Sequence, residues 1–76
     1  MRTVTLYTRP GCHLCDDARA QLVRLQESLP FTLEEVDITT DDALHARYLE
    51  RIPVTALDGE ELFDFYVDEE QLRRRL

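Results

Sequence analysis

Two cysteines, Cys12 and Cys15, stand three positions apart and are the only cysteines in the chain. They follow a turn at Pro10-Gly11, where a strand pattern gives way to a helical one. The first amides of a helix lack backbone partners and the helix dipole is positive there, so a thiolate at Cys12 is stabilised. Cys12 can then attack a disulfide, and Cys15 lies close enough to resolve the mixed disulfide that forms. The spacing predicts a redox-active dithiol.

Basic side chains lie on both sides of Cys12. Arg9 stands across the turn from it, and His13 falls between the two cysteines. A guanidinium or a protonated imidazole beside a thiol favours the thiolate form, which is the attacking species. We therefore expect Arg9 and His13 to modulate the reactivity of Cys12.

Two other interpretations of the cysteine pair stay open. Free cysteines are often buried as small apolar residues, which would make the pair purely structural. Zinc takes four ligands, and Cys12, Cys15, His13 and His45 would supply four. Adjacent Cys12 and His13 suit one tetrahedral ion poorly, and zinc sites usually show two paired motifs. An iron–sulfur cluster would need ligands from a second chain. The sequence favours redox chemistry with no bound metal.

The composition is that of one ordinary globular domain, residues 1–76, with 43% hydrophobic and 33% charged residues. The net charge is −7, and the nine residues that carry a full positive charge are all arginine, with no lysine. Phosphate binding needs clustered positive charge, so this balance argues against nucleic acid or an anionic membrane as a partner. The chain shows no signal-peptide pattern and no apolar run of membrane length. We expect a cytoplasmic monomer, in a compartment where close cysteine pairs are more often catalytic or metal-binding than structural.

The first half of the chain predicts a strand, a long helix and a second strand. Residues 3–7 alternate between polar and apolar, and a turn at 8–11 ends them. Apolar residues at spacings of three and four then mark a helix that Pro30 ends. Its stripe consists of Cys15, Ala18, Leu22, Leu25 and Leu29. Residues 31–38 predict the second strand, and two strands joined through a helix should be parallel.

Capping residues predict two shorter helices. Thr40 is a candidate N-cap, with Asp41 and Asp42 in the first turn, where acidic side chains favour the helix dipole. Asp68, three residues before Gln71, resembles a capping box and opens the last helix. Each of these helices follows a strand and can pack on the sheet.

A hairpin lies between the two shorter helices. Residues 52–57 and 62–66 predict the third and fourth strands, and Asp58-Gly59 between them is a strong hairpin-turn signal. The element order is β-α-β-α-β-β-α. The predicted fold is α/β, a four-stranded mixed sheet with flanking helices.

This combination resembles the thioredoxin superfamily. A Cys-x-x-Cys pair opens the first helix of a β-α-β-α-β-β-α chain, and Ile52-Pro53-Val54 begins the third strand. Within the superfamily, the short length and the stretch LYTRPGCHLC are most similar to the glutaredoxin-like proteins. The resemblance covers nearly the whole chain. It implies a thioredoxin-like fold and thiol-disulfide oxidoreductase activity, with a part in electron transport and cell redox homeostasis.

The resemblance also assigns roles to single residues. The family's nucleophile falls on Cys12 and its resolving cysteine on Cys15. A tyrosine and a basic residue precede the family's nucleophile by five and three positions, matched here by Tyr7 and Arg9. The resemblance therefore implies that both tune the activity.

The family's cis-proline falls on Pro53. The resemblance implies a cis peptide bond beside the sulfurs, which exposes the Ile52 backbone so that it can pair with a substrate's own chain. Cis bonds occur almost only before proline. Ile52 and Pro53 are therefore the expected substrate-binding residues.

Two departures from glutaredoxins bear on the thiol partner. His13-Leu14 stands between the cysteines where glutaredoxins carry Pro-Tyr. Phe63 and Asp64 occupy the positions of a Gly-Gly pair that lets the backbone approach glutathione. A Phe side chain is expected to obstruct that approach, and an Asp carboxylate to repel glutathione's carboxylates.

We therefore expect a small oxidoreductase that acts through Cys12 and Cys15 on a disulfide-containing protein or a small-molecule thiol substrate. Gly11 and Gly59 are the only glycines, so no phosphate-binding loop for a nucleotide or flavin is expected. Glutathione or another thiol would be a co-substrate rather than a resident cofactor. The alternative from a different class is a non-catalytic binding module with the same fold, using an aromatic surface. That surface would include Phe63, Phe65 and Tyr66.

Overall fold

A computed structural model describes residues 1–76 and contains the seven predicted elements in the predicted order. The strands are β1 (Thr3–Thr8), β2 (Thr32–Asp37), β3 (Val54–Leu57) and β4 (Glu60–Asp64). The helices are α1 (His13–Gln26), α2 (Asp42–Tyr48) and α3 (Glu69–Arg75), and a 3₁₀ turn at Ile38–Thr40 joins β2 to α2. No helix combines the length and the apolar character that crossing a bilayer requires.

The four strands form one mixed sheet in the order β2-β1-β3-β4. β1 pairs parallel with β2 and antiparallel with β3, and β3 and β4 form an antiparallel hairpin, which confirms the predicted sheet. The hairpin turn places both Asp58 (φ 49°) and Gly59 (φ 88°) in the left-handed region, as a tight hairpin loop requires. The Asp58 carboxylate accepts the Thr3 amide at 2.9 Å and pairs with Arg2, and these contacts lower its pKa.

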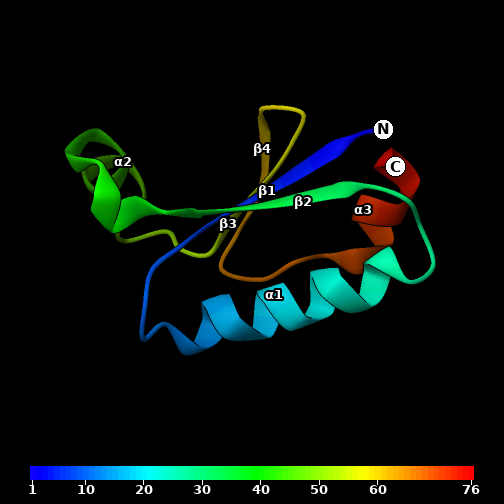
Figure 1. Cartoon of the computed structure of the whole chain (residues 1–76), viewed down its shortest axis with the longest axis horizontal. Coiled ribbons are helices and arrows are strands. Elements are labelled where there is room, and N and C mark those ends of the chain that lie inside the picture. The colour runs from blue at the N-terminus through cyan, green and yellow to red at the C-terminus, as the bar shows by residue number, and fades with distance from the viewer.

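The core divides into two clusters. In the first, Val4 and Leu6 of β1 pack with Leu22 of α1 and Leu72 of α3, all fully buried. Figure 1 shows α1 and α3 along the same side of the sheet, and α2 beyond the end of β2. The second cluster, at the α2 end, contains Cys15 and is completed by Ile38, Tyr48, Ile52 and Val54. The cysteine pair therefore packs on the second cluster.

Two element boundaries in the first half differ from the sequence prediction. β2 ends at Asp37 instead of residue 38, because the Asp37 carboxylate accepts the Thr39 amide at 2.9 Å and turns the chain into the 3₁₀ segment. α1 ends at Gln26 and does not reach Pro30. The amide of Leu29 still bonds to the Leu25 carbonyl, so Leu29 packs against the core from a turn outside the helix.

The second half contains three further corrections. The N-cap of α2 is Asp41 rather than Thr40, since the Asp41 carboxylate accepts the Ala43 and Leu44 amides. β3 begins at Val54 rather than at residue 52. β4 ends at Asp64, and residues 65–67 form an irregular connection to α3 instead of continuing the strand. The predicted cap of α3 is confirmed: the Asp68 carboxylate accepts the Gln71 amide at 3.1 Å.

Candidate active site

The cysteine pair lies at the first turn of α1. Cys12 is the N-cap, with an extended backbone, and its Sγ accepts the Cys15 amide at 3.2 Å. The two residues are joined by a disulfide, with their Cα atoms 5.2 Å apart. Cys12 is half-buried, whereas Cys15 is 1% exposed. One sulfur can therefore meet a partner from solution, and the other is covered by the core.

The loop before β3 lies against the same core cluster. The Ile52–Pro53 peptide bond is cis, as the resemblance implies, and both side chains are buried. Ile52 belongs to the cluster that contains Cys15. Neither the amide nor the carbonyl of Ile52 takes part in a backbone hydrogen bond within the protein. This loop therefore presents one residue whose main-chain groups are free for a second chain.

Tyr7 lies at the end of β1 that leads into the cysteine loop. Its ring stacks on Tyr48 of α2 with centroids 4.3 Å apart and ring planes 22° from parallel. Like Cys12, it packs against the second core cluster. The structure thus brings Tyr7, Cys12, Cys15, Ile52 and Pro53 into one region.

Behind Tyr48 lies a charged network that no local sequence pattern indicates. The Tyr48 hydroxyl donates to the Glu61 carboxylate at 2.9 Å, and Glu61 also pairs with Arg51 at 2.6 Å and with Arg47 at 2.9 Å. Arg51 in turn holds Asp64 through two hydrogen bonds, at 2.9 and 3.1 Å. The network ties the residue that precedes Ile52 to β4.

The pKa values of the network follow from these contacts. Hydrogen bonds from Arg51 and then Tyr48 lower the pKa of Glu61 to about 2. Burial first, and then the bond to Glu61, raise the pKa of Tyr48 to about 12. Hydrogen bonds to Asp64 and Glu61 raise the pKa of Arg51. At neutral pH Glu61 is therefore a carboxylate, Tyr48 a neutral phenol and Arg51 a guanidinium ion.

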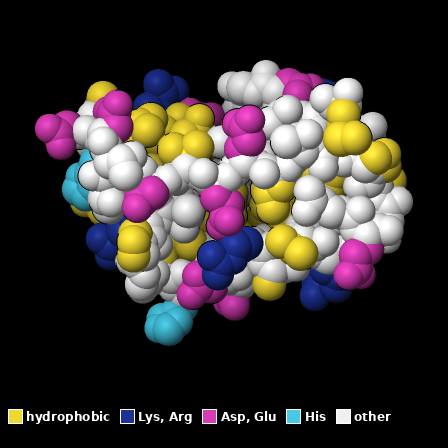
Figure 2. All heavy atoms as spheres, viewed as in Figure 1, with side chains coloured by type: hydrophobic (Ala, Val, Ile, Leu, Met, Phe, Trp, Pro, Cys, Tyr) yellow, Lys and Arg dark blue, Asp and Glu magenta, His cyan; other side chains and the backbone are white.

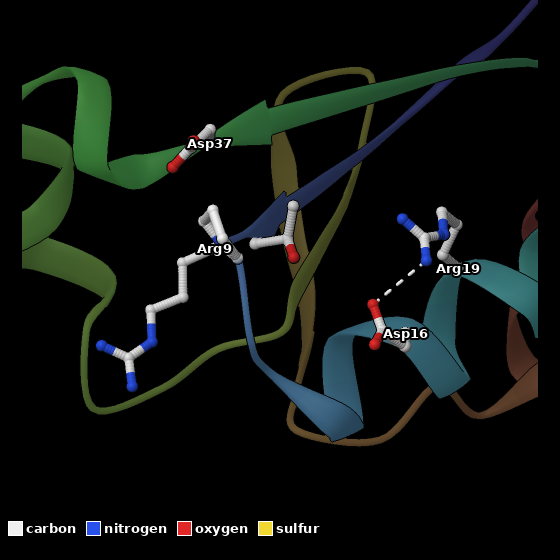
Figure 3. A pocket seen from close by; sticks show the side chains of 6 residues that line it. Arg9, Asp16, Arg19 and Asp37 are labelled. Atoms are coloured by element: carbon white, nitrogen blue, oxygen red, sulfur yellow. Dashed lines mark hydrogen bonds and ion pairs between the residues drawn. The ribbon is translucent and has the colours of Figure 1, made fainter.

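Arg9 and His13 are exposed, and neither forms an ion pair within the protein. Arg9 lines a shallow pocket of about 210 Å³ between the β1–α1 loop and the end of β2. In Figure 3 the Arg9 side chain extends away from Asp16 and Arg19, which pair with each other at 3.0 Å. The only hydrogen-bond donor to the Cys12 sulfur is the Cys15 amide. Any effect of Arg9 and His13 on Cys12 is therefore exerted through their charge rather than through a hydrogen bond.

The residues considered for zinc do not gather in one place. The chain's two histidine side chains lie apart on the face drawn in Figure 2, one at its left edge and one at the bottom. The structure contains no group of three or more His, Cys, Asp or Glu side chains placed to hold a metal ion.

Phe63 and Asp64, which stand at the positions of the glutaredoxin Gly-Gly pair, lie in β4. Phe63 is half-buried and packs against the first core cluster. Asp64 is exposed, and Arg51 pairs with its carboxylate at 2.9 Å. The Phe63 ring is therefore partly covered by core packing, and the Asp64 carboxylate faces a guanidinium group.

Comparisons with known proteins agree with this arrangement. The model of a family described as a glutaredoxin-like domain (DUF836) matches residues 3–76. An uncharacterized protein of Mycobacterium bovis is 37% identical over 75 residues, which are 92% of this chain and 77% of that protein. A Nitrosomonas europaea protein solved by solution NMR superposes with a TM-score of 0.87 at 32% identity, over 99% of this chain and 91% of that one.

The fold extends to more distant proteins. A mutant thioredoxin from Halobacterium salinarum superposes with a TM-score of 0.68 at 22% identity, covering 97% of this chain and 70% of the thioredoxin. At this level of identity the likeness concerns the fold alone. Together with the family match over residues 3–76, it shows that the chain belongs to the glutaredoxin-like domain family and has a thioredoxin-like fold.

Proposed function

We propose that the protein is a thiol-disulfide oxidoreductase in which Cys12 is the nucleophile and Cys15 the resolving thiol. The observation that carries the proposal is the asymmetry of the pair: a half-buried Cys12 at a helix N-cap, joined to a fully covered Cys15. An amide donor at 3.2 Å and the positive end of the α1 dipole favour a thiolate at Cys12 once the disulfide is reduced.

The reaction starts from the reduced pair. The Cys12 thiolate attacks one sulfur of a substrate disulfide, a Cys12–substrate disulfide forms, and the other half of the substrate leaves as a thiolate that takes a proton. Cys15 then loses its proton and attacks the Cys12 sulfur, which releases the second half as a thiol. The substrate gains two electrons and two protons, and the protein is left with the Cys12–Cys15 bond that the structure shows.

A reductant must then reopen that bond. We assign this step to a small thiol such as glutathione, or to another dithiol, acting as a co-substrate with no resident cofactor. Two reductant thiols, or one dithiol, supply the two electrons and become a disulfide. The setting is a monomer in the cytoplasm, where thiol reductants are abundant.

The cis-proline loop is the proposed substrate contact. The free amide and carbonyl of Ile52 lie in a loop packed on the cluster that contains Cys15. An extended segment of a disulfide-bearing chain can pair with these groups as an added strand does with a sheet edge. That pairing would hold the substrate sulfur near Cys12, with Pro53 keeping the loop in place.

Single-turnover kinetics of the reduced protein test the proposal. Reduced protein is mixed with 2-hydroxyethyl disulfide, the reaction is quenched by alkylation, and the mass of the intact protein is measured by mass spectrometry. We expect the wild type to lose two hydrogens as the internal disulfide forms, Cys12→Ser to be inert, and Cys15→Ser to accumulate a mixed disulfide. The two single variants are matched controls, since each keeps one thiol.

Other outcomes overturn specific parts. A mixed disulfide on Cys12→Ser would reverse the assigned roles of the two thiols. A wild type that reacts no faster than free dithiothreitol would favour the non-catalytic binding module with the same fold. A metal retained in protein purified without chelator would favour the metal-binding alternative.

A further inference from the structure

An apolar groove lies beside the cysteine pair and is not used by the chemistry described above. It runs between the first turns of α1 and the connection from β4 to α3, and has a volume of about 100 Å³. Its apolar lining consists of Leu14, Ala18, Phe65, Tyr66 and Val67. This volume is well below the roughly 300–1,000 Å³ typical of small-molecule pockets, so the groove has room for about one side chain.

Both walls of the groove are attached to the redox site. Leu14, on one wall, is one of the two residues between Cys12 and Cys15. Phe65, on the other, donates its amide to the Pro53 carbonyl at 2.8 Å. The groove therefore adjoins both the cysteine loop and the loop that contains Pro53.

The aromatic wall is exposed and held in an unusual backbone conformation. Phe65 is 42% exposed and Tyr66 is 73% exposed. Phe65 has φ 66°, in the left-handed region that a bulky residue enters only at an energetic cost. Such outliers persist where the surrounding structure enforces them, and they cluster at binding sites. Here the conformation keeps an aromatic ring at the surface next to the cysteines.

The charged groups at the groove are acidic. Asp17 lines it, is exposed and forms no ion pair within the protein. The Gln21 side-chain amide, also in the lining, donates to the Val67 carbonyl and to the Glu69 carboxylate, both at 3.3 Å. No basic residue lines the groove, and the whole chain carries a net charge of −7. The groove is therefore complementary to a cation beside an apolar side chain.

We propose that this groove seats an apolar side chain of a polypeptide disulfide substrate, with a neighbouring basic residue of that substrate facing Asp17. The proposal rests on the function proposed above and narrows its substrate class to cationic, apolar-flanked protein disulfides. Burial of the apolar side chain against Phe65 and Leu14 supplies contact area. The charge of Asp17 favours binding of basic over acidic sequences.

Three peptides of equal length test the groove, each with one cysteine in a mixed disulfide with mercaptoethanol. The cysteine is followed by Leu-Arg, by Leu-Glu or by Gly-Arg, and the second-order rate constant for oxidation of reduced wild-type protein is measured for each. We expect the Leu-Arg peptide to react about fivefold or more faster than Leu-Glu, given the charge complementarity. It should also react severalfold faster than Gly-Arg, because only leucine fills the groove.

Variants separate the contribution of the Asp17 charge from that of the apolar contact with Phe65. Asp17→Lys should bring the Leu-Arg to Leu-Glu ratio to about one or below it, whereas Glu50→Lys, the same charge change at an exposed residue outside the groove, should keep the preference. Phe65→Gly, which suits the left-handed backbone, should abolish the preference for leucine over glycine. Each result is a ratio of two peptides on one protein, so a change in thiol reactivity common to both cancels.

The outcomes distinguish this inference from the function it rests on. If the wild type reduces 2-hydroxyethyl disulfide but reacts with all three peptides at the same rate, the proposed role of the groove is wrong. The proposed oxidoreductase function would be unaffected by that result. Equal loss of the charge preference in Asp17→Lys and Glu50→Lys would place the selectivity in the overall charge and overturn the role of Asp17. If the wild type reacts with no disulfide, including 2-hydroxyethyl disulfide, the proposed oxidoreductase function is contradicted as well.

Discussion

The ring of Tyr7 stacks on the ring of Tyr48, with centroids 4.3 Å apart. This contact joins the end of β1, which leads into the cysteine loop, to α2. Tyr48 also donates to Glu61 at 2.9 Å, and Glu61 holds Arg51, the residue before Ile52. The two strand-to-loop segments that form the candidate site are therefore fixed to each other through side chains.

The stacked pair should show measurable coupling in stability. In a double-mutant cycle with Tyr7→Leu and Tyr48→Leu, we expect a coupling free energy of about 0.5–1.5 kcal/mol, the usual range for aromatic pairs. The free energy of unfolding of the four proteins is measured in urea. Additive effects of the two substitutions would show that the stacking makes no contribution beyond the area each ring buries.

The Tyr48 hydroxyl should contribute through its bond to Glu61. Tyr48→Phe keeps the ring and its stacking but removes the donor, so we expect the free energy of unfolding to fall by about 1 kcal/mol. Tyr66→Phe is the matched control, because Tyr66 is 73% exposed and its hydroxyl forms no hydrogen bond within the protein. Equal losses for the two variants would mean that the loss arises from something other than this bond.

The low pKa of Glu61 predicts a pH dependence of stability. Arg51 and Tyr48 lower it from 4.5 to about 2, so in the folded state the carboxylate stays ionised where the unfolded chain would be protonated. The stabilisation is therefore complete above about pH 5 and is lost as the pH falls from 4.5 through about 2. We expect the difference in unfolding free energy between wild type and Glu61→Gln to shrink over that range.

Urea unfolding of both proteins between pH 6 and pH 2 measures this difference. Glu50→Gln serves as the control, because Glu50 is exposed and outside every ion pair. A difference between wild type and Glu61→Gln that stays constant down to about pH 2 would contradict the assigned role of the carboxylate.

The sheet was predictable because its signals are local. Alternation in residues 3–7, the helical stripe through Leu22 and the Asp58-Gly59 turn each specify an element within a short window. The N-cap of α2 was misassigned because Thr40 and Asp41 are both good capping residues. The structure uses the Thr40 hydroxyl to bond the Asp37 carbonyl at 2.8 Å, which leaves the cap to Asp41.

The candidate site was predictable only where residues are close in sequence or match the family's motif. Cys12 and Cys15 are one helical turn apart, so their contact follows from spacing alone. Tyr48 and Arg51 meet Glu61 of β4 through side-chain bonds between separate segments of the chain, and no pattern in a single sequence indicates such contacts. Phe65 was expected in a strand because aromatic residues favour strands, but the chain turns there with a positive φ.

The positive φ of Phe65 predicts that the Phe65→Gly variant has a higher free energy of unfolding than the Phe65→Ala variant. At an ordinary position, replacing alanine by glycine costs about 0.5–1 kcal/mol, because glycine loses more backbone freedom on folding. At residue 65, φ 66° strains any residue with a Cβ, whereas glycine adopts it freely. Both substitutions remove the same ring, so the lost ring contacts cancel in the comparison.

We therefore expect Phe65→Gly to unfold at higher urea than Phe65→Ala, by about 1 kcal/mol in the free energy of unfolding. Ala20→Gly is the control, at an exposed position within α1 where the backbone is helical. There glycine should lower the free energy of unfolding by about 1 kcal/mol relative to alanine. Should Phe65→Ala be the more stable of the pair, the backbone at residue 65 would not be left-handed in solution. The Phe65 ring would then not be held at the surface of the groove by the backbone conformation of residue 65.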